Sequence, residues 1–152
     1  MANILNQDFS EFIVSLNKTN VEYLLVGGFA VIYHVYNRTT GDIDVWVNPT
    51  KDNFFKLKMA FAEFGLSLFD MTEEKFLNTT DYDVFTFGVP PVCIEILTKV
   101  KGVEFNQCFE VASFQEFDGI DVRIIDLRNL LIAKKAAGRY KDLDDIQNLD
   151  PS

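Results

Sequence analysis

The stretch from Val26 to Val47 constrains the fold most, because it holds two strand-like runs with a helix-like segment between them. The first run ends in Gly27-Gly28, and the second opens with Asp42 and Asp44. From there the second run alternates apolar and polar residues, which predicts a half-buried strand. Residues two apart on a strand point the same way, so both carboxylates are expected to face one cleft.

The rest of the chain predicts an α/β (α+β) protein in which strands interleave with helices around a small mixed sheet. Apolar spacings of three and four predict helices over 8–18, 29–36, 51–64, 72–77, 127–137 and 141–149. Runs rich in β-branched and aromatic residues predict strands over 21–26, 42–47, 83–87, 92–97, 109–114 and 120–125. The absence of repeats and linkers favours a single domain over residues 1–152.

Capping residues support several of these boundaries. The helix starts expected are at Asp8, Thr50, Thr72 and Asp126, and the ends at Gly65 and Gly138. An Asp118-Gly119 dipeptide predicts a hairpin between the last two strands.

Composition excludes several classes of protein. The net charge of −9 disfavours a broad contact surface for nucleic acid and binding to anionic membranes. Cys93 and Cys108 do not make a disulfide scaffold, and Cys93 lies in an apolar run that predicts a core position. The longest uncharged run, from Leu24 to Tyr36, is too short to span a bilayer. The N-terminus lacks a signal-peptide pattern, so we expect a cytoplasmic protein.

Gly27-Gly28 has two interpretations. Glycines between a strand and a helix permit positive φ and let a ligand approach the backbone, and the helix N-terminus beyond them suits a phosphate. The alternative, which the pair alone favours, is a tight turn required for packing.

Three carboxylates predict a divalent-metal site. Two carboxylates on one face, Asp42 and Asp44, repel each other unless a cation lies between them, and Mg²⁺ prefers such oxygen ligands. Glu95 stands between Ile94 and Ile96 in an apolar strand, where a charge is costly unless it is paired or bound to metal. The alternatives are a solvated strand face for the aspartates and an exposed edge position for Glu95.

Three segments together resemble a known superfamily. They are "VGGFAVIYH…NRTTGDIDVWV", "PPVCIEILT" and "LLIAKKAAGRYKDLDDI". Two glycines, a nearby Asp-Ile-Asp and a distant strand carboxylate look like the nucleotidyltransferase superfamily of the DNA polymerase β type. The segments resemble its small bacterial branch, which includes the AbiEii-like toxins and related stand-alone nucleotidyltransferases.

The resemblance implies roles for individual residues. Asp42 and Asp44 would bind Mg²⁺ in a two-metal site, and Glu95 would be the third carboxylate, which touches a metal or accepts the proton of the attacking hydroxyl. The nucleotide triphosphate would be held by six residues: Gly27, Gly28, Arg38, Thr40, Lys134 and Arg139.

Some of these residues have plainer alternatives. Arg38 could equally be a surface charge. The tail could be a helix surface with Lys/Asp pairs, an interpretation that we favour for Lys141 and Asp145. His34, the only histidine, is expected to be a satisfied core residue rather than a ligand or base.

The reaction implied is transfer of a nucleoside monophosphate from NTP to a hydroxyl, with release of pyrophosphate. The acceptor could be a protein side chain, a tRNA end or a small hydroxylated molecule. A second hypothesis is a catalytically weak or inactive domain of the same fold that acts as a protein partner in a toxin–antitoxin or defence pair. A third, an unrelated α/β protein, is disfavoured because three separated segments agree.

Overall fold

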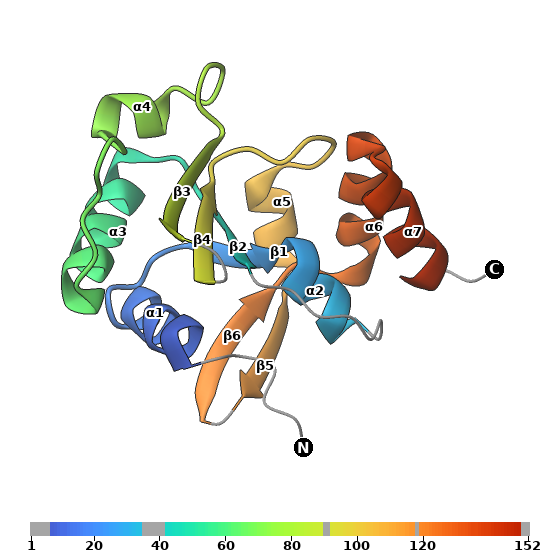
Figure 1. The fold of residues 1–152 in the computed structure, drawn as a ribbon, viewed down its shortest axis with the longest axis horizontal. Helices are drawn as coiled ribbons and strands as arrows, with labels where there is room; N and C mark the ends of the chain where they lie inside the picture. The colour runs from blue at the N-terminus through green and yellow to red at the C-terminus, as the bar shows by residue number, and fades with distance from the viewer. Residues whose placement is uncertain (1–6, 35–41, 90–91, 118, 150–152) are drawn as a thin grey trace.

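The computed structural model describes residues 7–34, 42–89, 92–117 and 119–149. Within these ranges helices and strands are interleaved along the chain (Figure 1). The helices are α1 (Gln7–Lys18), α2 (Gly27–Tyr33), α3 (Lys51–Phe64), α4 (Glu73–Leu77), α5 (Phe105–Glu110), α6 (Leu127–Ala137) and α7 (Tyr140–Leu149). The strands are β1 (Tyr23–Val26), β2 (Asp42–Val47), β3 (Val84–Val89), β4 (Val92–Leu97), β5 (Ser113–Phe117) and β6 (Ile120–Ile124).

The strands form one mixed sheet in the order β3-β4-β2-β1-β6-β5. Pairing is antiparallel between β1 and β2, β3 and β4, and β5 and β6. It is parallel between β2 and β4 and between β1 and β6. The predicted α/β class with a small mixed sheet is therefore confirmed. The two aspartates of β2 lie on a strand in the middle of the sheet.

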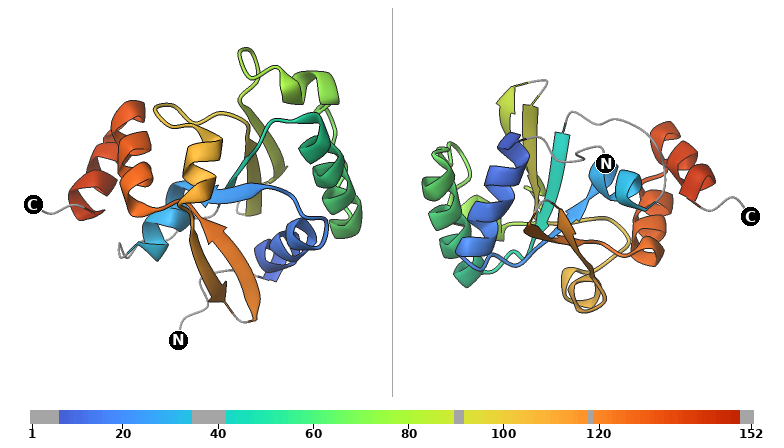
Figure 2. Two further views of the ribbon diagram at one scale, coloured as in Figure 1. Left: turned by 180° about the vertical axis from the view of Figure 1, so that it is seen from behind. Right: turned by 90° about the horizontal axis from the view of Figure 1, so that it is seen from below.

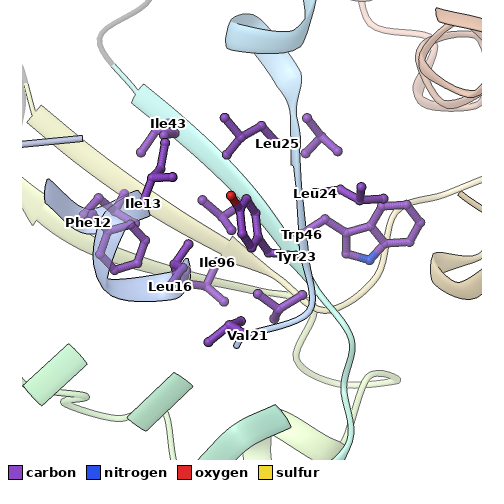
Figure 3. Close-up of a cluster of buried hydrophobic side chains, with 14 of the residues drawn as sticks. Phe12, Ile13, Leu16, Val21, Tyr23, Leu24, Leu25, Ile43, Trp46 and Ile96 are labelled. Atoms are coloured by element: carbon purple, nitrogen blue, oxygen red, sulfur yellow. The ribbon is translucent and has the colours of Figure 1, made fainter. Parts of the chain in front are cut away.

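Each face of the sheet is covered by helices. On one face α1 contributes Phe12, Ile13 and Leu16, which point toward the side of the sheet that carries Ile43 and Ile96 (Figure 3). Helix α3 packs beside α1 on this side, as Figure 2 shows. On the other face Trp46 is buried and makes an edge-to-face contact with Phe105 of α5, with ring centroids 5.3 Å apart.

Most of the predicted helix boundaries are confirmed by their caps. Thr50 accepts a hydrogen bond from the Asn53 backbone N–H at 3.1 Å, and Thr72 and Asp126 act in the same way at α4 and α6. Gly65 and Gly138 end α3 and α6 with left-handed backbones. Asp8 is the exception, since α1 begins at Gln7 and Asp8 lies within its first turn.

The predicted strand over 109–114 begins four residues too early, and only Ser113 and Phe114 of it lie in a strand. Helix α5 covers Phe105–Glu110 there, and strand β5 begins only at Ser113. Phe105 and Cys108 are buried on one side of α5, and Phe109 lies partly buried beside them. This spacing of three and four is a helical signal, which the β-rich composition of the following residues obscured. The helix that was missed covers the Trp46 end of β2.

Asn53 ties the start of α3 to the sheet. Its side chain is only 1% exposed. Its Oδ1 accepts from the Glu22 backbone N–H at 2.8 Å, and its Nδ2 donates to the carbonyls of Glu22 and Asn48 at 3.1 and 2.9 Å. Asn53 therefore holds together three backbone groups that lie next to a packed core.

We expect Asn53→Ala to lower the free energy of unfolding by about 2 kcal/mol, because it removes the acceptor of the Glu22 N–H and one hydrogen bond from each of two carbonyls that keep a backbone partner. Urea denaturation with an unchanged m value would measure the loss. Asn106→Ala, at an exposed position of α5, is the control and should stay within about 0.5 kcal/mol of the wild type. Equal effects in the two variants would contradict the structural role of Asn53.

Within the described ranges, no helix is both long and apolar enough to cross a bilayer.

Candidate active site

Strands β2 and β4 bring two of the predicted carboxylates side by side. The strands are parallel, and their register pairs Asp44 with Glu95 and Asp42 with Cys93. Ile94 and Ile96 are buried, whereas Glu95 is half-buried on the opposite face, as the sequence predicted. Asp42 is on the same face as Asp44, nearer the start of β2, and is exposed. All three predicted carboxylates therefore lie on one face of two neighbouring strands.

Gly27 lies against the Asp44 side chain. Its φ is +67°, in the left-handed region that favours glycine. A Cβ atom at this position would overlap the Asp44 carboxylate, with its Cγ at only 2.8 Å. Gly28 follows as a buried residue within the first turn of α2. A glycine is needed at position 27 because the backbone passes close to a carboxylate of the site.

A pocket of about 490 Å³ opens over these residues. Its lining includes Gly27, Asp42, Asp44 and Glu95. Lys134 of α6, Asp142 of α7 and Arg139 between these helices also line it, as do Asp83, Thr86 and Lys99 from β3, β4 and their flanks. Predicted site residues that are far apart in the sequence thus line one pocket.

The contribution of β3 to the pocket was not predicted from the sequence. Thr86 is the register partner of Glu95 in the β3–β4 hairpin. The turn signal at 88–91 could have predicted this pairing, because a hairpin centred between Pro90 and Pro91 places position 86 opposite position 95.

Helices α6 and α7 are joined by a buried group of charges. Lys134 is 6% exposed, and Asp142 and Asp145 are both 0% exposed. The Lys134 Nζ lies 3.1 Å from a carboxylate oxygen of each aspartate. The interpretation of Asp145 as part of an exposed surface with Lys/Asp pairs is therefore wrong. The i,i+3 spacing did predict a shared face, but the sequence did not show that this face packs on α6. The Lys141 side chain lies outside what the structure describes.

Arg139 connects this charged group to the pocket. Its Nε donates to Asp142 at 2.6 Å and its Nη2 at 3.2 Å, while 69% of its side chain is exposed. Hydrogen bonding to Asp142 raises the pKa of Arg139, and the charges of Asp44 and Glu95 raise it further. Burial alone would raise the pKa of Asp142, but hydrogen bonds from Arg139 and Lys134 hold it below its usual range. Arg139 therefore lies within the electrostatic reach of the carboxylates on β2 and β4.

Comparison with known proteins identifies the fold. No protein-family model and no curated protein matches the sequence. The structure is similar to that of a candidate nucleotidyltransferase from Thermotoga maritima, with 12% identity and a TM-score of 0.57 over 90% of this chain and 86% of that one. It is also similar to an antigenic nucleotidyltransferase-like protein from Paracoccidioides brasiliensis, with 15% identity and a TM-score of 0.53 over 97% and 78% of the two chains. The chain has the nucleotidyltransferase-like fold.

The nucleotidyltransferase-like fold does not by itself supply a complete metal site in this chain. Within the described residues, no group of three or more His, Cys, Asp or Glu side chains is arranged so that it could hold a metal ion. The donors present nevertheless fit Mg²⁺, because Asp44 and Glu95 are oxygen ligands in register on neighbouring strands. Mg²⁺ commonly uses one or two protein carboxylates and completes its shell with substrate phosphates and water.

Cys93 is confirmed as a core residue, whereas His34 is hydrogen-bonded as predicted but is not fully buried. His34 is half-buried, and its Nε2 donates to the Ile125 carbonyl at 2.7 Å, so it links α2 to the end of β6. Cys93 is buried, and both burial and the neighbouring Asp42 carboxylate raise the pKa of its thiol. Arg38 and Thr40 lie outside the described residues, so their predicted contacts with nucleotide stay predictions.

Proposed function

We propose that this protein is a Mg²⁺-dependent nucleotidyltransferase that moves a nucleoside monophosphate from NTP to a hydroxyl of an acceptor molecule. One observation carries the proposal: Asp44 and Glu95 lie in register on neighbouring strands, beside Gly27 and in a pocket that also holds Arg139. Their convergence supports the roles that the sequence resemblance implied.

Different residues would bind the triphosphate and the metal. Gly27 leaves room beside its backbone for the Asp44 carboxylate, and the exposed guanidinium of Arg139 would contact the triphosphate. Asp44 and Glu95 would hold magnesium, which would neutralise charge on the reacting phosphate and on the leaving pyrophosphate. The Lys134 ammonium already has two aspartate partners, so we expect it to act on the nucleotide mainly through the position of α6 and α7.

The proposed reaction is an in-line displacement at the α-phosphorus. The acceptor hydroxyl oxygen forms a new bond to phosphorus, the bond to the β-phosphate oxygen breaks, and pyrophosphate leaves with that electron pair. The hydroxyl proton passes to Glu95 or to solvent. Glu95 suits this role because it is half-buried beside Asp44 rather than fully exposed.

Nucleotide binding should require the metal. Asp42, Asp44, Glu95 and Asp83 all line the pocket, so an unaccompanied triphosphate would meet several like charges. We expect calorimetry to show binding of ATP or another NTP in Mg²⁺ but not in chelator. The double variant Asp42→Asn with Asp44→Asn should remove the signal, since it removes both β2 carboxylates.

The matched control is Asp70→Asn with Asp121→Asn, which makes the same charge change at exposed positions. It should bind Mg²⁺–NTP like the wild type. Unchanged binding in the β2 double variant, or an equal loss in the control, would contradict the proposed site.

Transfer is tested by incubating the protein with each α-labelled NTP in a cell lysate. The wild type should label an acceptor, and the β2 double variant should not. Sensitivity of the label to protease or ribonuclease then separates a protein side chain from a tRNA end or a small molecule. Binding of Mg²⁺–NTP without any labelled product would instead favour the catalytically weak partner protein.

A further inference from the structure

Asp142 holds Arg139 by an unusually complete set of contacts. Its fully buried carboxylate accepts from Lys134 Nζ at 3.1 Å and from Arg139 Nε and Nη2 at 2.6 and 3.2 Å. It also accepts from the Arg139 backbone N–H at 3.2 Å. Two parallel bonds from one guanidinium fix both its distance and its orientation.

This arrangement is uncommon for an arginine that is largely exposed. Such a side chain ordinarily samples many rotamers, and ordering it costs up to about 2 kcal/mol of entropy. Here the buried Asp142 carboxylate accepts hydrogen bonds from two of the guanidinium N–H groups, which leaves the other N–H groups available to a ligand. Arg139 and Asp142 both line the pocket, and the charges of Asp44 and Glu95 act on Arg139 across it. The ordered guanidinium is therefore presented to the pocket.

We propose that Asp142 is a positioning residue, which holds Arg139 where it meets the phosphates of a nucleoside triphosphate placed over Asp44 and Glu95. This inference rests on the proposed function. It means that α7, which carries Asp142, contributes to substrate binding as well as to packing against α6. Lys134 supplies the counter-charge that allows the Asp142 carboxylate to be buried.

Asp145 provides a matched comparison. It is equally buried and lies at the same 3.1 Å from Lys134, whereas every hydrogen bond that Arg139 donates within the described residues goes to Asp142. Asp142→Asn and Asp145→Asn thus make the same charge change in one buried group. Only the first disturbs Arg139.

We expect Asp142→Asn to weaken Mg²⁺–ATP binding by about 10- to 100-fold in calorimetry, the range for loss of a charged hydrogen bond. Asp145→Asn should change it by less than about 3-fold, even where thermal unfolding shows that both variants lose similar stability. If Asp142 had only a structural role, Asp142→Asn and Asp145→Asn would weaken Mg²⁺–ATP binding equally. That result would contradict the positioning role.

A double-variant cycle with Arg139→Gln provides a measurement that does not depend on stability. Because Arg139 is exposed, Arg139→Gln should fold and weaken binding to a similar extent. In the Asp142→Asn background it should add less than about 3-fold if the two residues act as a unit. Full additivity, or wild-type binding by Asp142→Asn, would overturn the positioning role.

The outcomes also separate this inference from the proposed function. Loss of binding in the Asp42/Asp44 double variant combined with normal binding by Asp142→Asn overturns only the positioning role. A wild-type protein that does not bind Mg²⁺–NTP overturns both.

Discussion

Replacement of Gly27 by alanine is expected to lower nucleotide transfer by about 100-fold or more, the scale reported for displacements of about 1 Å at a reacting centre. The new Cβ would overlap the Asp44 carboxylate, so either that side chain or the start of α2 must move. The φ of +67° adds strain, since residues with a Cβ rarely adopt it. Transfer of labelled nucleotide and calorimetric binding of Mg²⁺–NTP would both measure the loss.

Gly65→Ala is the matched control for this variant. Gly65 also has positive φ, at +90°, but an added Cβ there meets nothing within 4 Å. The control should cost about 1 kcal/mol of stability and leave transfer unchanged. If Gly27→Ala transferred nucleotide as well as Gly65→Ala, the close approach of the backbone to Asp44 would have no functional role.

Replacement of Lys134 by methionine should have the largest effect on stability, a loss of about 3–5 kcal/mol in the free energy of unfolding. The variant keeps the volume of the side chain but leaves Asp142 and Asp145 buried without their shared ammonium. Urea denaturation would measure the change. Lys135→Met, at the exposed neighbouring position, should stay within about 0.5 kcal/mol of the wild type.

The pH dependence of this effect has a defined sign. Hydrogen bonds lower the pKa of Asp142 in the folded protein, so its contribution to stability is fully present above the ordinary carboxyl pKa. That contribution is lost as the pH falls through the lowered value. Lys134→Met should therefore narrow the stability difference between neutral and acidic solution. A difference as large as in the wild type would show that Lys134 does not hold Asp142 ionised.

The sequence predicted the parts of the site that depend on strand alternation and missed those that depend on packing between helices. The shared face of Asp42, Asp44 and Glu95 was predicted because a period of two fixes the face on which each side chain lies. The burial of Asp145 could not be predicted, because an isolated helix pattern does not show which neighbour covers each face. The face of α7 that carries Asp142 and Asp145 is buried only because α7 packs against α6.

The fold shows the same division. Caps such as Thr50 and Gly65 act through adjacent backbone groups, so local sequence predicts them well. Helix α5 was not predicted, and its last two residues were assigned to a strand, because its six residues are too few to show a strong helical period beside a β-rich segment. Its position is determined by the contact of Phe105 with Trp46, which is distant in sequence.

Because Glu95 stands between two buried isoleucines, the strand register that places it beside Asp44 is also the register that the stability of the fold requires. A shift of β4 by one residue would expose Ile94 and Ile96 and drive the Glu95 charge into the core. Such a chain would unfold rather than persist with a damaged pocket, and cellular proteolysis would remove it. Folding of the chain therefore selects the register in which Glu95 lies beside Asp44.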